Sequence, residues 1–187
     1  MYFIYVILLV YFSDTPSSGN LKIITRKEWL AQPPVQAPKA LTHPTPYIVI
    51  THTGSESCAT LAECILFVRR FQEFHVESHG WWDIAYNFLV GGDGNVYEGR
   101  GWDGQSATAP KYNSAAIGIT FIGTFAQKIP PSKQIAAGKA LIAEGVRLGK
   151  ISKDYKLLAH SQVSKTDSPG IAFFEEIKKW DHWTQEA

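Results

Sequence analysis

The most constraining feature of this chain is a pair of short apolar runs that lack the alternation of a half-exposed strand. Residues 47–52 read Tyr-Ile-Val-Ile-Thr-His, and residues 116–122 read Ala-Ile-Gly-Ile-Thr-Phe-Ile. Continuous, β-branched runs of this length are typical of strands buried inside a sheet. We therefore expect both segments to be central strands.

Other segments carry the patterns of helices and of a hairpin. Apolar residues recur at helical spacing from about residue 60 to 76. A second helix is predicted to follow Pro131 and to stop near Gly149, and a third to span 171–180. The turn sequence 91–95 between apolar stretches 86–90 and 96–98 predicts a hairpin, and 155–160 is predicted as a further strand. Together these elements imply one α/β domain, with a central mixed sheet of about five strands flanked by three main helices.

Composition agrees with one globular domain, which we place at residues 20–187. Apolar residues make up 45% of the 187 residues and charged residues 19%, a balance typical of a folded chain. The formal net charge of +1 gives no sign of a general nucleic-acid binder.

The first twelve residues, MYFIYVILLVYF, form an uninterrupted apolar run. A membrane-spanning helix needs about 20 residues, whereas the apolar core of a signal peptide needs about 7 to 15. We therefore expect residues 1–19 to be a signal peptide and the protein to be secreted. No Lys or Arg precedes the run, so the alternative is a membrane anchor.

The chain has two cysteines, Cys58 and Cys64. An even number of cysteines in a secreted chain favours a disulfide. The alternative is a pair of buried free thiols.

Two short stretches and one long one carry a family resemblance. The short ones are 51–53, Thr-His-Thr, and the segment from His160 to Ser168; the long one is 75–102, which includes Trp81-Trp82-Asp83-Ile84-Ala85-Tyr86-Asn87-Phe88. They resemble insect-type peptidoglycan recognition proteins, which share a fold with phage-type N-acetylmuramoyl-L-alanine amidases. The resemblance covers about residues 21 to 184.

The resemblance implies that this chain is not an enzyme. Catalytic members bind zinc through a His, a second His and a Cys, and the matching positions here are Thr51, His160 and Ser168. Zinc hydrolysis needs three protein ligands around an open position, so we expect no metal, no cofactor and no catalytic residue. His52 follows Thr51 on a strand, so its side chain should point to the opposite face and not replace the missing ligand.

The resemblance also implies a set of ligand-binding residues. These are Thr53, His75, Gly80, Trp81, Tyr86, Arg100, Trp102, His160 and Thr166. In the family, Gly-Trp at 80–81 accompanies peptidoglycan of the meso-diaminopimelic acid type, and Arg100 matches the Arg that pairs with the extra carboxylate of that residue. A guanidinium grips a carboxylate through two parallel hydrogen bonds.

We therefore expect a non-catalytic pattern-recognition protein of innate immunity. Its partners would be bacterial muropeptides and other recognition or signalling proteins, and Glu77 matches a position that supports ligand-induced self-association in some relatives. One alternative is a zinc-dependent amidase. The other is a regulator that binds no ligand, which Thr108, in place of a His common in ligand-binding members, and the unusual loop 103–106 favour.

Overall fold

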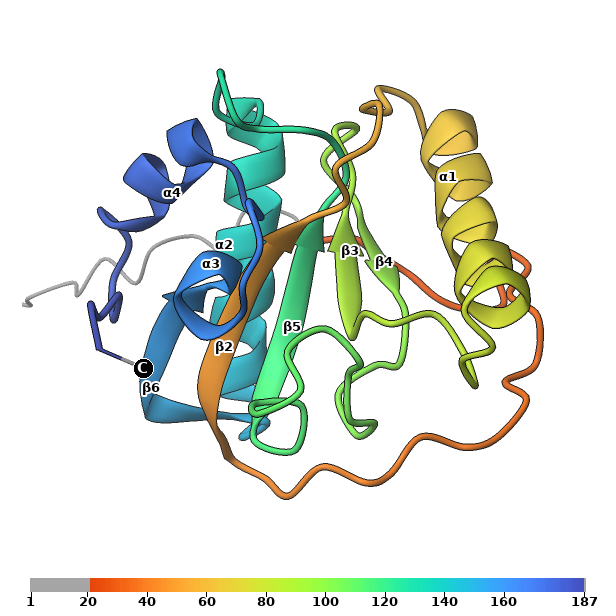
Figure 1. Ribbon diagram of the computed structural model, residues 1–187, viewed down its shortest axis with the longest axis horizontal. Helices are drawn as coiled ribbons and strands as arrows, with labels where there is room; N and C mark the ends of the chain where they lie inside the picture. Colours follow the sequence, from red (N-terminus) through yellow and green to blue (C-terminus); the bar gives the residue numbers. More distant parts are fainter. Residues whose placement is uncertain (1–20, 187) are drawn as a thin grey trace, which may run out of the picture.

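The computed structural model describes residues 21–186 and shows a sheet between two layers of helices (Figure 1). In this part of the chain the strands follow the order β1-β4-β3-β5-β2-β6. Neighbouring strands are parallel, except that β3 and β4 form an antiparallel hairpin. The strands are β1 (Ile23–Ile24), β2 (Thr45–His52), β3 (Phe88–Val90), β4 (Val96–Glu98), β5 (Ala116–Phe121) and β6 (Ile151–Ala159). The predicted α/β class with a central mixed sheet is confirmed.

The sheet has one strand more than the five or so that the sequence predicts. Strand β1 contains two residues, and Ile23 and Ile24 pair in parallel with Val96 and Tyr97 of β4. A strand of two residues has no detectable alternation in the sequence. Its pairing covers the edge of the hairpin.

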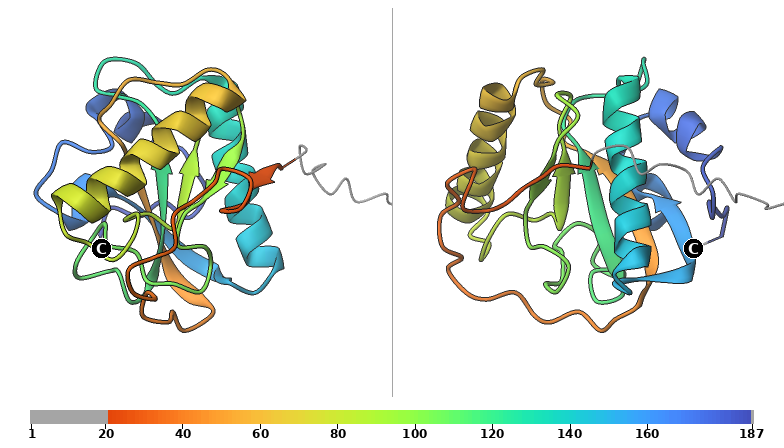
Figure 2. Two further views of the ribbon diagram at one scale, coloured as in Figure 1. Left: turned by 90° about the vertical axis from the view of Figure 1, so that its right-hand side faces the viewer. Right: turned by 180° about the vertical axis from the view of Figure 1, so that it is seen from behind.

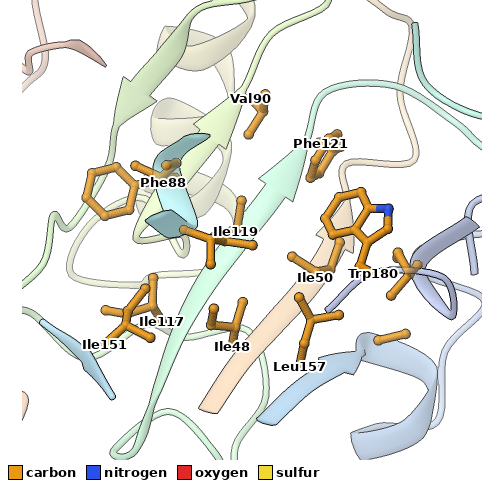
Figure 3. Packing of buried hydrophobic residues seen from close by; sticks show 14 of the residues in the cluster. Ile48, Ile50, Phe88, Val90, Ile117, Ile119, Phe121, Ile151, Leu157 and Trp180 are labelled. Atoms are coloured by element: carbon orange, nitrogen blue, oxygen red, sulfur yellow. The ribbon is translucent and has the colours of Figure 1, made fainter. Parts of the chain in front are cut away.

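One face of the sheet is covered by two of the predicted helices (Figure 2). The helices of the described chain are α1 (Leu61–Glu73), α2 (Ser132–Arg147), α3 (His160–Val163) and α4 (Ile171–Ile177). The side chains of α2 and α4 pack with Ile48, Ile50, Ile117 and Ile119 of the two central strands in one buried cluster. Figure 3 shows this cluster, with Trp180 lying over the ends of β2 and β5. Both apolar runs are therefore central strands, as predicted.

The opposite face is covered only at its two sides. Val68 of α1 lies in a buried cluster with Leu89 and Tyr97 of the hairpin. Val163 of α3 packs against Val49 of β2 in another cluster. The middle of this face, over β2 and β5, lies between these two helices (Figure 1), and the candidate site is found there.

The first helix changes geometry where it reaches this site. The sequence predicts a helix to about residue 76, but α1 ends at Glu73 and continues as a π-helical turn, η1 (Phe74–Ser78). Such turns bond each N–H to the carbonyl five residues back, and here the N–H of His79 donates to the carbonyl oxygen of Phe74. The wider turn turns the buried side chain of His75 toward Ala85, whose N–H donates to its Nδ1 at 3.2 Å.

The cysteine prediction is confirmed, because Cys58 and Cys64 form a disulfide just before and inside α1. The predicted signal peptide lies outside the described residues. Within residues 21–186, no helix is both long and apolar enough to cross a membrane.

The start of α1 should be a measurable source of stability. The hydroxyl of Thr60 accepts the N–H of Glu63, whose carboxylate accepts the N–H of Thr60 in return. Replacing such a cap by Ala costs about 1 kcal/mol, so Thr60→Ala should lower the free energy of unfolding in urea by that amount. Ser132→Ala is the matched control, because Ser132 opens α2 without a side-chain cap. Equal effects of the two substitutions would contradict the capping role.

Candidate functional site

A groove of about 270 Å³ lies on the open face, where the carboxyl end of β2 meets η1 and α3. It is lined by Thr51, His52, Thr53, Gly54, His75, Trp81, Ala85, Tyr86, Ala107, Thr108, His160, Thr166 and Ser168. Six of the nine predicted ligand-binding residues are in this lining. Three small residues of the lining, Ala85, Gly54 and Ala107, were not predicted, because residues that only leave space carry no chemical signature in the sequence.

The three positions that the family resemblance assigns to zinc ligands, Thr51, His160 and Ser168, all line this groove. Thr51 is buried, and its hydroxyl lies 2.6 Å from that of Thr120 on β5. The Oγ of Ser168 accepts the N–H of His52 at 3.0 Å. His160 lines the groove from the start of α3. The hydroxyls at 51 and 168 therefore make hydrogen bonds within the chain.

His160 keeps the orientation of a metal ligand. Its Nε2 lies 2.9 Å from the carbonyl oxygen of Thr108. A carbonyl only accepts, so Nε2 carries the ring proton, and Nδ1 of the neutral ring is left with a lone pair. This Nδ1 is buried without a hydrogen-bond partner among residues 21–186. A carbonyl partner on the far nitrogen is the usual support of a metal-binding His.

The donor set as a whole does not fit zinc. Zinc prefers thiolate, imidazole and carboxylate donors, and in residues 21–186 no group of three or more His, Cys, Asp and Glu side chains is placed to hold a metal ion. Thr51 and Ser168 offer neutral hydroxyls. His160 alone supplies one imidazole.

His52 lies at the edge of the groove and does not take the place of Thr51. Along β2, Val49 faces the groove side, whereas Ile48 and Ile50 face the opposite cluster. The ring of His52 continues this alternation, because its Nδ1 accepts the N–H of Phe125, a residue of that opposite cluster. The ring still reaches the groove, since it lies at the strand end. Burial lowers the pKa of His52, and the nearby His160 lowers it further by a smaller amount.

Aromatic rings form the wall of the groove on the η1 side. The ring of Trp81 stacks on His79 at 4.7 Å and on His75 at 5.2 Å between centroids. Tyr86 meets His75 edge-on at 5.2 Å. Burial lowers the pKa of His75 to about 4, with smaller effects from His79 and Arg100, and burial raises the pKa of Tyr86 to about 12. Both groups are therefore uncharged at neutral pH, and with Trp81 they form an uncharged aromatic wall.

Gly80 shapes this wall without lining the groove. Its φ of 66° lies in the left-handed region that favours glycine. The turn brings the N–H of Trp81 to the carbonyl oxygen of His75 at 2.9 Å. Gly80 therefore acts through the position of Trp81.

Thr53, Thr166 and Thr108 are polar residues of the groove that are fixed by bonds within the chain. The hydroxyl of Thr53 accepts the N–H of Gly123 at 2.9 Å, and that of Thr166 accepts the N–H of Ser168 at 3.2 Å. The Thr108 hydroxyl lies 3.1 Å from that of Ser106. The loop that the sequence analysis found unusual is thus tied into the groove wall.

Arg100 lines a second cavity of about 220 Å³ beside the groove. The cavity is lined by Lys39, Trp82, Arg100, Gln105, Ser106, Pro110, Asn113 and Ser114. Residues 81 and 107 line the groove, and their chain neighbours 82 and 106 line this cavity. The segments 81–82 and 106–107 therefore lie between the groove and the cavity.

The guanidinium of Arg100 is held by backbone carbonyls. Its Nε donates to Ile84 at 2.6 Å, Nη1 to Gln105 at 2.9 Å and Nη2 to Asp83 at 3.4 Å. It makes no ion pair with any carboxylate of the described chain. Burial lowers its pKa, and the charge of Asp83 opposes this shift.

Trp102 corrects the predicted set. Its ring lies 4.4 Å from that of Phe88 and packs against the cluster on the α2 face. A side chain on Gly145 of α2 would meet this ring at 2.8 Å. Trp102 therefore packs with the cluster on the α2 face rather than lining the groove.

Comparison with known proteins agrees with this geometry. Residues 41–171 match a family model described as N-acetylmuramoyl-L-alanine amidase. Peptidoglycan-recognition protein SC2 of Drosophila melanogaster is 40% identical over 178 residues, which cover 95% of this chain and 96% of that protein. Peptidoglycan-recognition protein LE of the same organism is 47% identical over 161 residues, or 86% of this chain. The matched region is about half (47%) of the LE chain.

Solved structures of such proteins superpose closely on this fold. The ectodomain complex of peptidoglycan recognition proteins LCa and LCx, bound to tracheal cytotoxin, gives a TM-score of 0.87 at 45% identity and covers 89% of this chain and 100% of that one. Protein LE has been solved in complex with tracheal cytotoxin, described as monomeric diaminopimelic acid-type peptidoglycan. It gives a TM-score of 0.86 at 47% identity and covers 87% of this chain and 96% of that one.

Placing His and Cys at positions 51 and 168 should create a zinc site together with His160. We expect the double variant Thr51→His, Ser168→Cys to retain about one zinc ion per chain after dialysis against a weak chelator, because His160 already presents Nδ1. Metal content measured by mass spectrometry tests this. The matched control is Thr51→Ser, Ser168→Ala, which adds no ligand. Stoichiometric zinc in the unmodified protein would contradict the conclusion that Thr51, His160 and Ser168 do not fit zinc.

Proposed function

The chain belongs to the family of peptidoglycan-recognition proteins, and we propose that it binds diaminopimelic acid-type muropeptide without cleaving it. The observation that carries this proposal is the unpaired guanidinium of Arg100. The extra carboxylate of diaminopimelate is the group that distinguishes this peptidoglycan from the lysine type. A site that selects it needs a fixed cation facing a cavity.

Arg100 meets that requirement by its hydrogen bonds. A guanidinium has five N–H donors, and three of them bond to backbone carbonyls. One N–H remains on each of Nη1 and Nη2, and a carboxylate can accept both. Carbonyls orient the group but do not neutralise it, so the positive charge is available to a ligand.

The groove supports the proposal by its shape and lining. The uncharged aromatic wall with Trp81 and Tyr86 offers apolar area to a sugar ring or peptide chain. The Arg100 cavity adjoins it through residues 81–82 and 106–107. A stem peptide that lies along the groove can therefore place one side chain in the Arg100 cavity. Two relatives of this fold have been solved with such a ligand.

The absence of cleavage is supported by the donor set. A water molecule becomes a nucleophile at neutral pH when a metal ion lowers its pKa. Thr51 and Ser168 are hydroxyls with partners of their own, so His160 has no co-ligands. Bound muropeptide would stay intact, as a signalling role requires.

A titration with two muropeptides tests ligand choice. By isothermal calorimetry, the diaminopimelic acid type should bind more tightly than the lysine type. Arg100→Ala should weaken the former by about 2 kcal/mol, or about 30-fold, because a partly buried charge pair is lost, and should leave the latter unchanged.

The matched control is Arg147→Ala, which removes an exposed guanidinium paired with Glu144 on α2. It should change neither affinity. Equal binding of both muropeptides would contradict the specificity. No binding of either would favour the ligand-free regulator, and release of free stem peptide would favour the amidase.

We also propose that the protein is secreted, with residues 1–19 as a signal peptide, and that it signals through contacts with other recognition proteins. The motivating observation is the apolar run 1–12 before the small residues Ser17, Ser18 and Gly19. Mass spectrometry of protein from insect-cell medium should find an N-terminus close to Asn20. Recovery only in membranes, with Met1 retained, would favour the anchor.

A further inference from the structure

Asp83 is a buried carboxylate just behind the Arg100 cavity. Its side chain is 4% exposed and pairs with Arg26, with Nη1 3.0 Å from Oδ2 and Nη2 3.2 Å from Oδ1. Oδ1 also accepts the side-chain amide of Gln72 at 2.7 Å and the N–H of Ile84 at 2.8 Å. A buried carboxylate with this many donors has one defined position.

The same network fixes the backbone that holds Arg100. The carbonyls of Asp83 and Ile84 accept from its guanidinium, and the peptide between these residues is fixed by the bond from the Ile84 N–H to Oδ1. On the other side, Nη1 of Arg26 donates to the carbonyl of Gly99 at 2.8 Å. The pair therefore holds two of the three carbonyls that accept from the guanidinium, and it also holds the peptide that precedes Arg100.

Charge gives this arrangement a second effect. Asp83 lies near two guanidiniums, those of Arg26 and Arg100, but forms its ion pair with Arg26. Without the carboxylate, the two cations would repel each other across a poorly solvated region. With it, Arg26 is neutralised, and Arg100 stays in place with its own charge unmatched.

We propose that the Arg26–Asp83 pair is the positioning unit of the specificity residue Arg100. It holds the guanidinium with its two remaining N–H groups directed to the ligand carboxylate, so that little ordering is left for the binding step. This inference rests on the proposed function for its ligand, but the position of Arg100 can be measured without one.

The experiment compares Asp83→Asn and Arg26→Gln, each with and without Arg100→Ala. Arg26 is partly exposed and Asp83 is not, so Arg26→Gln is the milder change, and a thermal melt establishes that each variant folds. Two quantities are measured: exchange of the Arg100 Nε–H with solvent by NMR in the ligand-free protein, and affinity for the two muropeptides. Arg147→Gln, which breaks an exposed pair with Glu144, is the matched control.

We expect Arg26→Gln to speed exchange of the Arg100 Nε–H at least about tenfold, because local order is lost. Affinity for the diaminopimelic acid type should fall at least about fivefold, with less than about twofold change for the lysine type. In the Arg100→Ala background the same substitution should change neither affinity. Arg26→Lys, which keeps the charge, should restore part of the loss.

Two results would overturn the inference. One is unchanged exchange of the Arg100 Nε–H in every folded variant. The other is an equal loss of affinity with and without Arg100, which would make the pair a general structural support. If exchange responds as expected but the unmodified protein binds both muropeptides equally, the proposed ligand is wrong and the positioning role stands.

Discussion

The site depends on the parallel pairing of β2 with β5 and β6. The register places Thr51 opposite Thr120 and Ile50 opposite Ala159, the residue before His160. Carboxyl ends of parallel strands meet at one edge of a sheet, where ligands of α/β proteins commonly bind. Segments near residues 51, 123 and 160 are thereby brought together. A slip of β2 by one residue would exchange Thr51 with His52 and turn every apolar side chain of the strand to the wrong face. The burial of Ile48 and Ile50 against α2 and α4 therefore fixes the site.

Within this frame, the hydroxyls of Thr51 and Ser168, at two of the three proposed ligand positions, find hydrogen-bond partners within the chain. The Thr51 hydroxyl bonds across the sheet to Thr120, and the Ser168 oxygen caps the last peptide of β2. The second bond joins the segments near residues 52 and 168, which a metal ion held by positions 51 and 168 would also connect. His160 differs, because its Nδ1 has no partner in residues 21–186 while its Nε2 is held. A buried acceptor without a partner costs free energy, so this one nitrogen is the polar atom of the three positions that the fold leaves unsatisfied.

The sequence predicts most of the fold because its strands and helices carry their own patterns. The β2 and β5 runs and the helical spacing of α1 are local signals, whereas β1 is too short to show one and the π turn at 74–78 depends on the contact of His75 with Ala85. Site residues followed the family resemblance, which brought six of nine to the groove but misplaced Trp102. The Arg26–Asp83 pair joins residues 57 positions apart, and neither residue has a neighbour in sequence that reveals the partner. Long-range polar networks of this kind become visible only with coordinates.

The distribution of charge in this network separates stability from recognition. Asp83 is neutralised by Arg26 and takes two further hydrogen bonds, so it is satisfied within the chain. Arg100 donates only to backbone carbonyl oxygens. Their dipoles fix a guanidinium without cancelling its charge. Had Arg100 taken the ion pair instead, its charge would be matched within the chain, and the cavity would offer a ligand carboxylate no unmatched cation. Affinity for an anion at this position follows from leaving one cation unpaired while a neighbouring pair prevents it from moving.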